Sequence, residues 1–127
     1  MHEIRLKRVY EAASPDDGVR VLADRLWPRG IRKENLPYDV WAKKITPSSE
    51  LRTLYHRGEM PFAGFREGYV EELEHSEGAA AFAKKCREWL QTQNVTLLFA
   101  AKNQQENHAL VLAAWLRKKT AEPDTTA

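Results

Sequence analysis

The segment Val95-Thr96-Leu97-Leu98-Phe99-Ala100-Ala101 decides the fold class, because it is an apolar run with β-branched residues that does not alternate with polar ones. A strand that is covered on both faces has this composition, as in a parallel sheet flanked by helices. Two earlier segments can supply its neighbours. Ile4 to Glu11 begins with apolar residues at every second position, and Val19 to Ala23 is also typical of a strand. The stretch from Ser14 to Gly18 between them predicts a turn in which Gly18 takes a positive φ.

Helical patterns fill the rest of the chain. Thr46-Pro47-Ser48-Ser49-Glu50 offers a hydroxyl that can cap, a proline for the first helical position and an acid for the first turn, so it predicts a helix that runs to about His56. Amphipathic helices are expected after Pro61 and after Gly78, and Asn107 is expected to cap a last helix. We therefore predict an α/β fold, with a small single-domain sheet that is at least partly parallel and is flanked by about four helices.

Length and charge limit the domain count and the class of partner. A chain of 127 residues with 43% hydrophobic content predicts one domain over residues 1–121, followed by a flexible tail over 122–127. The 20 basic and 18 acidic side chains nearly cancel, so nucleic-acid binding would need a local basic patch. The single cysteine, Cys86, excludes an internal disulfide and lies on an apolar helical stripe that predicts burial in the core. The sequence contains no long apolar stretch, which predicts a cytoplasmic protein without a membrane partner.

The segment from Asp24 to Lys44 is expected to be an irregular loop, because it contains Pro28, Gly30 and Pro37 and has no sustained period. A long ordered loop in a compact domain is often functional. Ligands of open α/β sheets bind outside the carboxyl ends of parallel strands. Residues 24–30 and 102–108 each follow a predicted strand, so they would meet if those strands run parallel in one sheet.

These two segments carry groups that suit an anion. Arg25 and Arg29 have planar guanidinium forks that match phosphates and carboxylates, Trp27 offers a flat apolar surface, and Lys102 precedes the free amides at the start of the last helix. We predict a small anionic partner in an Arg- and Lys-lined cleft. The expected ligand-binding residues are Arg25, Trp27, Arg29, Lys43, Ser48, Arg52, Lys102 and Asn107.

A structural interpretation of the same residues stays open. Asp24 could form an internal salt bridge with Arg25 or Arg29 that holds the loop, and Trp27 could belong to the core. Asn107 is explained by capping a helix, as are the adjacent serines at the start of the earlier helix.

Candidate catalytic residues are Asp24, His56 and His108. Either histidine could carry a proton near neutral pH, with Asp24 orienting it or holding a metal, although histidines at helix ends are more often structural. Isolated glycines give neither a phosphate-binding loop nor a dinucleotide fingerprint, and the sequence specifies no cofactor and no dedicated metal framework.

Several blocks of the chain resemble the YeaO-like family, known as domain of unknown function 488. They are Asp24-Arg25-Leu26-Trp27-Pro28-Arg29-Gly30, then Trp41 with Lys43, Pro47 and Ser48, then Tyr69 with Glu72-Leu73, then Val95 to Lys102 and Asn107-His108-Ala109. The resemblance implies a small bacterial α/β protein and brings no established activity.

Three functions are therefore expected in order. The first is a module that binds a phosphate-bearing or carboxylate ligand. The second is a phosphoester hydrolase that uses Asp24 with His56 or His108. The third is a nucleic-acid-binding module in which Trp27 or Trp41 stacks on bases.

Overall fold

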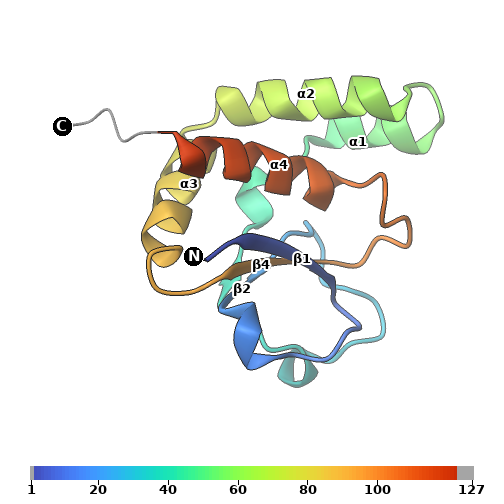
Figure 1. Cartoon of the computed structure of the whole chain (residues 1–127). Helices are drawn as coiled ribbons and strands as arrows, with labels where there is room; N and C mark the ends of the chain where they lie inside the picture. Colours follow the sequence, from blue (N-terminus) through green and yellow to red (C-terminus); the bar gives the residue numbers. More distant parts are fainter. Residues whose placement is uncertain (1, 123–127) are drawn as a thin grey trace.

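The computed structural model describes residues 2–122, in which four strands form one parallel sheet in the order β1-β4-β2-β3. The strands are β1 Ile4–Arg8, β2 Val19–Leu22, β3 Val40–Trp41 and β4 Val95–Phe99. The helices are α1 Ser49–His56, α2 Phe62–Glu74, α3 Glu77–Trp89 and α4 His108–Ala121. They gather on one side of the sheet (Figure 1). The predicted α/β class, with a parallel sheet and four helices, is confirmed.

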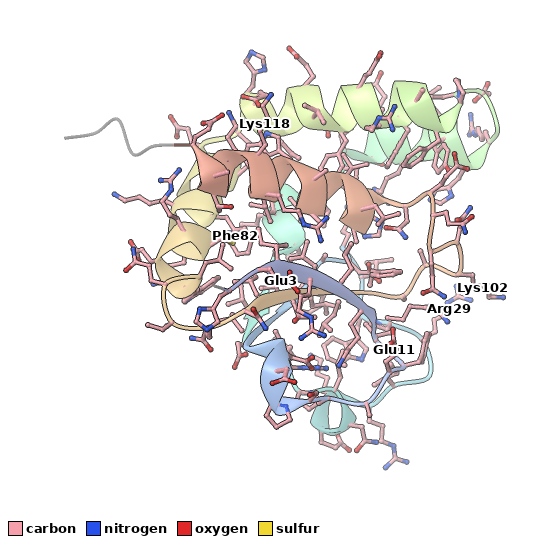
Figure 2. All side chains as sticks on the ribbon, viewed as in Figure 1. Glu3, Glu11, Arg29, Phe82, Lys102 and Lys118 are labelled. Carbon is pink, nitrogen blue, oxygen red and sulfur yellow. The ribbon has the colours of Figure 1, made fainter. Side chains whose placement is uncertain are left out.

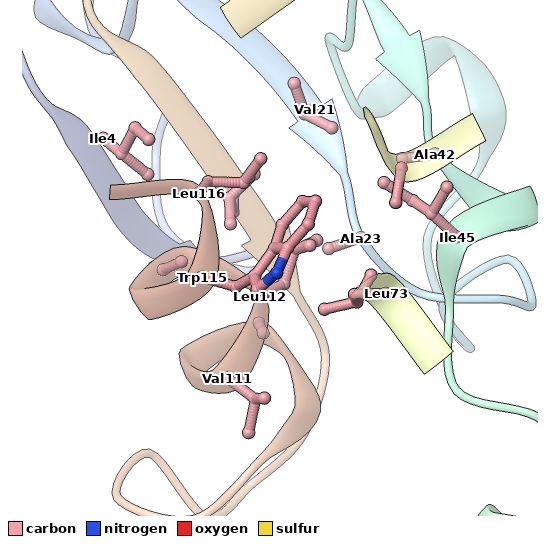
Figure 3. Close-up of a cluster of buried hydrophobic side chains, with 14 of the residues drawn as sticks. Ile4, Val21, Ala23, Ala42, Ile45, Leu73, Val111, Leu112, Trp115 and Leu116 are labelled. Atoms are coloured by element: carbon pink, nitrogen blue, oxygen red, sulfur yellow. The ribbon is translucent and has the colours of Figure 1, made fainter. Parts of the chain in front are cut away.

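Side-chain alternation along the strands divides the interior into two cores. Val19, Val21 and Ala23 face the helices, where α4 contributes Leu112 and Leu116 to the main core (Figure 3). On the opposite face, Leu22 and Leu98 form a second, smaller core with Val9 and Leu36. All five residues of β4 are buried, which explains why its sequence does not alternate. Helices cover one face of the sheet, whereas loop residues from the 24–41 segment cover the other.

The segment predicted as an irregular loop over residues 24–44 contains the short strand β3, and that part of the prediction was wrong. β3 pairs in parallel with β2, with Val40 opposite Val21 and Trp41 opposite Leu22. Two residues are too few to show an alternating pattern, so pairing with β2 determines this strand. Single 3-10 turns at Lys33–Asn35 and Lys43–Ile45 flank it.

Two predicted boundaries also differ from the structure. The first strand ends at Arg8, after which the Arg8 amide donates to the Glu11 carboxylate across a turn. Helix α1 begins two residues later than a start at Pro47 would give. Its cap is Ser48, whose hydroxyl accepts from the Leu51 amide at 3.2 Å. The Thr46 hydroxyl instead donates to the Lys43 carbonyl, so it is not available to cap α1.

A buried ionic cluster fixes the predicted turn before β2. Asp17 is 1% exposed and lies 2.8 Å from Lys7 Nζ, and it also pairs with Arg20. Burial alone would raise the pKa of Asp17, but hydrogen bonds from Lys7, the Ser14 amide and Arg20 together lower it. Gly18 has φ +64°, as the turn requires. This cluster lies at the amino-terminal end of the sheet and supports the fold.

Other expectations concern burial and the chain end. Cys86 is fully buried on α3, and burial raises the pKa of its thiol to about 12, in agreement with a core role. Within residues 2–122, no helix has the length and apolar character needed to cross a membrane. Of the predicted tail, Glu122 follows α4 as its cap, and residues 123–127 lie outside the described part of the chain.

Candidate functional site

A pocket of about 560 Å³ lies at the carboxyl ends of β2 and β4. Its walls come from residues 24–29 after β2, from residues 100–108 after β4, and from residues 46–56 together with Phe65 on the helical side. The parallel arrangement of β2 and β4 brings the first two segments together, as the sequence predicted. Nine of the predicted site residues line this pocket: Asp24, Arg25, Trp27, Arg29, Arg52, His56, Lys102, Asn107 and His108.

Asp24 joins the elements that meet at this edge. Its Oδ1 lies 2.9 Å from Nε2 of His108, and its Oδ2 accepts from the Ala100 amide at 3.0 Å. Its carbonyl accepts from Nε1 of Trp41 at 2.7 Å. The ends of β2, β3 and β4 and the start of α4 are thereby linked through one residue. Asp24 and His108 are 14% and 22% exposed, so the pair is mostly shielded from water.

This geometry decides between two earlier interpretations of Asp24. Within the described residues, its ion-pair partner is His108, and neither Arg25 nor Arg29 forms a salt bridge with it. The predicted internal salt bridge to an arginine was therefore wrong. The carboxylate instead orients a histidine, and both arginines are left exposed beside the pocket.

Positive charge dominates the lining. Four permanently charged cations, Arg25, Arg29, Arg52 and Lys102, stand against two carboxylates, those of Asp24 and Glu106. Figure 2 shows Arg29 and Lys102 projecting close together from neighbouring loops. The Arg52 Nε donates to the Pro47 carbonyl at 3.2 Å, which holds this partly buried guanidinium beside the pocket. Such a lining favours an anion over a cation.

Trp27 lies between the pocket and the second core. Its ring packs edge-on against Tyr38 and Trp41, with centroids 5.6 Å apart in both pairs, and its Nε1 donates to the Ile31 carbonyl. Trp27 is therefore mainly a packing residue that borders the pocket with part of its surface. The predicted flat apolar surface for a ligand has to come from other residues.

Two predicted ligand-binding residues lie outside the pocket lining. Lys43 stands over the Trp41 ring, with Nζ 4.7 Å from the centroid, and Ser48 caps α1. Asn107 does line the pocket, but it is 4% exposed and its side chain is used twice within the protein. It accepts from the Leu110 amide at 3.0 Å and donates to the Asn103 carbonyl at 2.7 Å, which agrees with its predicted capping role.

Sequence reasoning missed an aromatic wall. Tyr55 on α1 and Phe65 on α2 both line the pocket, and their rings are stacked with centroids 4.7 Å apart. Burial, and secondarily the Glu106 carboxylate, raise the pKa of Tyr55. Tyr55 lies three residues after Arg52, so helical spacing could have placed it beside this predicted residue. The packing of α1 on α2 that adds Phe65 has no local sequence signal.

The titratable groups of the pocket form pairs and no larger cluster. Within residues 2–122, no three His, Cys, Asp or Glu side chains converge as metal ligands would. The Asp24–His108 pair can hold or move a proton, and His56 lines the same pocket from α1.

The parallel sheet, the single helical layer and the cationic pocket together define a small α/β protein with a candidate ligand site at its carboxyl edge. The chain belongs to the family of domain of unknown function 488, and residues 3–127 match its part described as the inactive DUF488-N3 subclade. The predicted family is confirmed. No solved structure matches the chain.

Similar proteins have no described function. The chain is 50% identical over 114 residues to the uncharacterized protein YeaO of Escherichia coli (strain K12), covering 90% of this chain and 96% of that protein. It is 42% identical over 113 residues to the uncharacterized proteins Mb3100c of Mycobacterium bovis and Rv3073c of Mycobacterium tuberculosis, covering 89% of this chain and 92% of each relative. These relatives match over nearly their full length.

Proposed function

We propose that this protein is a binding module for a small ligand that carries a phosphate or carboxylate group. The observation that carries the proposal is the convergence of Arg25, Arg29, Arg52 and Lys102 on one pocket from three separate segments of the chain. Arginine forks match phosphate and carboxylate oxygens, and the amino-terminal end of α4 adds a favourable dipole. A bacterial cytoplasm, where Cys86 stays reduced, is the proposed location.

The family description supports binding more than catalysis, because the matching subclade is described as inactive. The frame of the pocket is also fixed before a ligand arrives. Asp24, Asn107 and Arg52 each make hydrogen bonds within the protein that position the surrounding loops. A prearranged site loses less entropy on binding, which favours affinity.

A panel of nucleotides, sugar phosphates and small carboxylates tests this proposal by thermal unfolding. A ligand that binds the folded state raises the melting temperature, so at least one class is expected to do so in a concentration-dependent way. Arg29→Ala should reduce the shift. Arg32→Ala is the matched control, since Arg32 is exposed in the same loop but does not line the pocket. No shift across the panel, or an equal shift in Arg29→Ala, contradicts the proposal.

A phosphoester hydrolase is the second candidate, favoured by the 2.9 Å contact between His108 and Asp24. His108 would take a proton from water as the water oxygen bonds to phosphorus, and His56 would give a proton to the departing ester oxygen. Release of phosphate from aryl phosphates should then fall at least about a hundredfold in His108→Ala and in His56→Ala. Turnover that survives both substitutions removes these assignments.

Nucleic-acid binding has less support. Trp27 and Trp41, the residues expected to stack on bases, pack against each other, and Lys43 covers the Trp41 ring. A retardation assay would detect such binding as a complex that weakens steeply with added salt.

A further inference from the structure

We infer that the ligand of this pocket is an amphiphilic anion, in which one phosphate or carboxylate group is joined to a flat, uncharged apolar body that contacts Tyr55. This inference rests on the proposed anion-binding function and adds the chemical class of the ligand. It follows from three features of the pocket: its size, its aromatic wall and the distribution of charge around it.

The pocket is too large for an inorganic anion alone. At about 30 Å³ for each water in the liquid, its volume of about 560 Å³ corresponds to roughly twenty waters. An inorganic phosphate would displace only a few of them. Pockets of about 300–1,000 Å³ normally hold ligands with a substantial apolar body. Most of the volume therefore has to be filled by the part of the ligand that carries the anion.

The aromatic wall gives this body its contact surface. Tyr55 is half-buried, with Phe65 stacked against its ring and Phe62 at 5.9 Å, so its position is fixed by packing. The buried residue Pro47 extends the same wall. Water gains little from such a surface, whereas an apolar group gains both burial and contact with the ring.

Leu26 supplies apolar surface from the loop after β2. Its side chain is 73% exposed although it lines the pocket. An isolated exposed leucine needs no explanation, but this one lies in the same loop as Arg25 and Arg29. A ligand whose anionic end meets these arginines can therefore have its body covered by Leu26, which would bury that side chain as well.

Charge separates the two ends of the pocket. The arginines after β2 and Lys102 supply the positive end, while the Glu106 carboxylate acts on the Tyr55 hydroxyl. A second negative group beside Tyr55 would be repelled by Glu106 and would also lose its hydration. The arrangement thus selects a ligand with one anionic end and an uncharged body.

Calorimetric titration with inorganic phosphate, methyl phosphate, phenyl phosphate and 1-naphthyl phosphate tests the inference, with phenol as the neutral control. Affinity should rise at least about tenfold from methyl to phenyl phosphate, because the ring buries apolar area, and it should rise again for naphthyl phosphate. Phenol should bind far more weakly than phenyl phosphate. Equal affinities for methyl, phenyl and naphthyl phosphates would overturn the inference and leave the anion site standing. If no phosphate binds, or if phenol binds as well as phenyl phosphate, the proposed function itself fails.

Variants of Tyr55 locate the body of the ligand. Tyr55→Leu should remove most of the preference for phenyl over methyl phosphate while leaving methyl phosphate affinity unchanged, and Tyr55→Phe should keep the preference. Phe82→Leu is the control, because Phe82 packs against Trp89 on α3 and does not line the pocket. A full preference in folded Tyr55→Leu contradicts the placement. Retained methyl phosphate binding shows that the variant is folded, and the wild-type series decides the ligand class if it is not.

Discussion

At the residue scale, Asp24 is the side chain on which the candidate site depends most. It lies 84 positions before His108 in the sequence, yet their side chains are 2.9 Å apart. The sequence predicted that Asp24 would either orient a histidine or pair with a neighbouring arginine. Only the packing of α4 beside the sheet decides between these partners, because both choices satisfy the carboxylate equally well in local terms.

Replacing Asp24 by asparagine should lower the free energy of unfolding by about 1–3 kcal/mol, since a mostly shielded hydrogen-bonding group loses its charge and cannot satisfy the same partners. Urea unfolding measures the change. Asp16→Asn is the control, because Asp16 is exposed on the protein surface. Equal stability of Asp24→Asn and the wild type would mean that Asp24 does not link the elements of this edge.

Asp17 should make the protein sensitive to acid. Its pKa is lowered in the folded state from 3.8, so its charge stabilises the fold above that pH, and the contribution is lost as the pH falls through the folded pKa. The urea midpoint should therefore drop between about pH 4 and pH 2 in the wild type. In Asp17→Asn the protein should already be less stable at neutral pH, because Lys7 and Arg20 lose their partner, and the acid-dependent drop should be smaller. An unchanged pH profile would exclude this role.

At the scale of the element, the sequence predicted strands β1, β2 and β4 and all four helices, because each has a period or a composition of its own. It did not predict β3, whose two residues are held by pairing with β2. The start of α1 was placed too early for a similar reason. Thr46, Ser48 and Ser49 are all acceptable caps by residue type, and only the backbone geometry selects Ser48.

Ser48→Ala should destabilise the fold by about 1 kcal/mol through loss of the α1 cap, and it should leave ligand affinity unchanged because Ser48 does not line the pocket. Thermal unfolding and calorimetric titration of the same variant separate the two effects. Ser49→Ala, at the exposed first position of α1, should be nearly neutral. Weaker binding in a stable Ser48→Ala variant would instead assign Ser48 to the site.

The turn before β2 should tolerate no side chain at Gly18. A Cβ there would lie 2.0 Å from the Asn94 carbonyl oxygen, and the φ of +64° adds strain. Gly58, after α1, has φ +73° but open space around it. Gly58→Ala should therefore cost about 1–2 kcal/mol for the left-handed backbone alone, and Gly18→Ala clearly more. Urea midpoints measure both losses, and similar losses would show that the contact with Asn94 does not limit the turn.

At the scale of the whole molecule, the position of the candidate site could be predicted, but its full lining could not. Residues 24–30 and 102–108 both follow predicted strands, and the parallel sheet brings them to one edge. Tyr55 and Phe65 reach the pocket only because α1 packs on α2, and their sequence context is that of ordinary helix faces. Lys43 shows the converse, since a basic residue in the right segment points to Trp41 instead.

Mapping amide chemical shifts by NMR during titration with phenyl phosphate tests the central claim most directly. The account predicts saturable shifts concentrated in residues 24–29, 52–56 and 102–108, which line the pocket, and loss of these shifts in an Arg29→Ala, Lys102→Ala double variant. Shifts centred elsewhere, such as around Arg5 and Arg117 in the hollow beside β1, or the absence of saturable shifts, would contradict it.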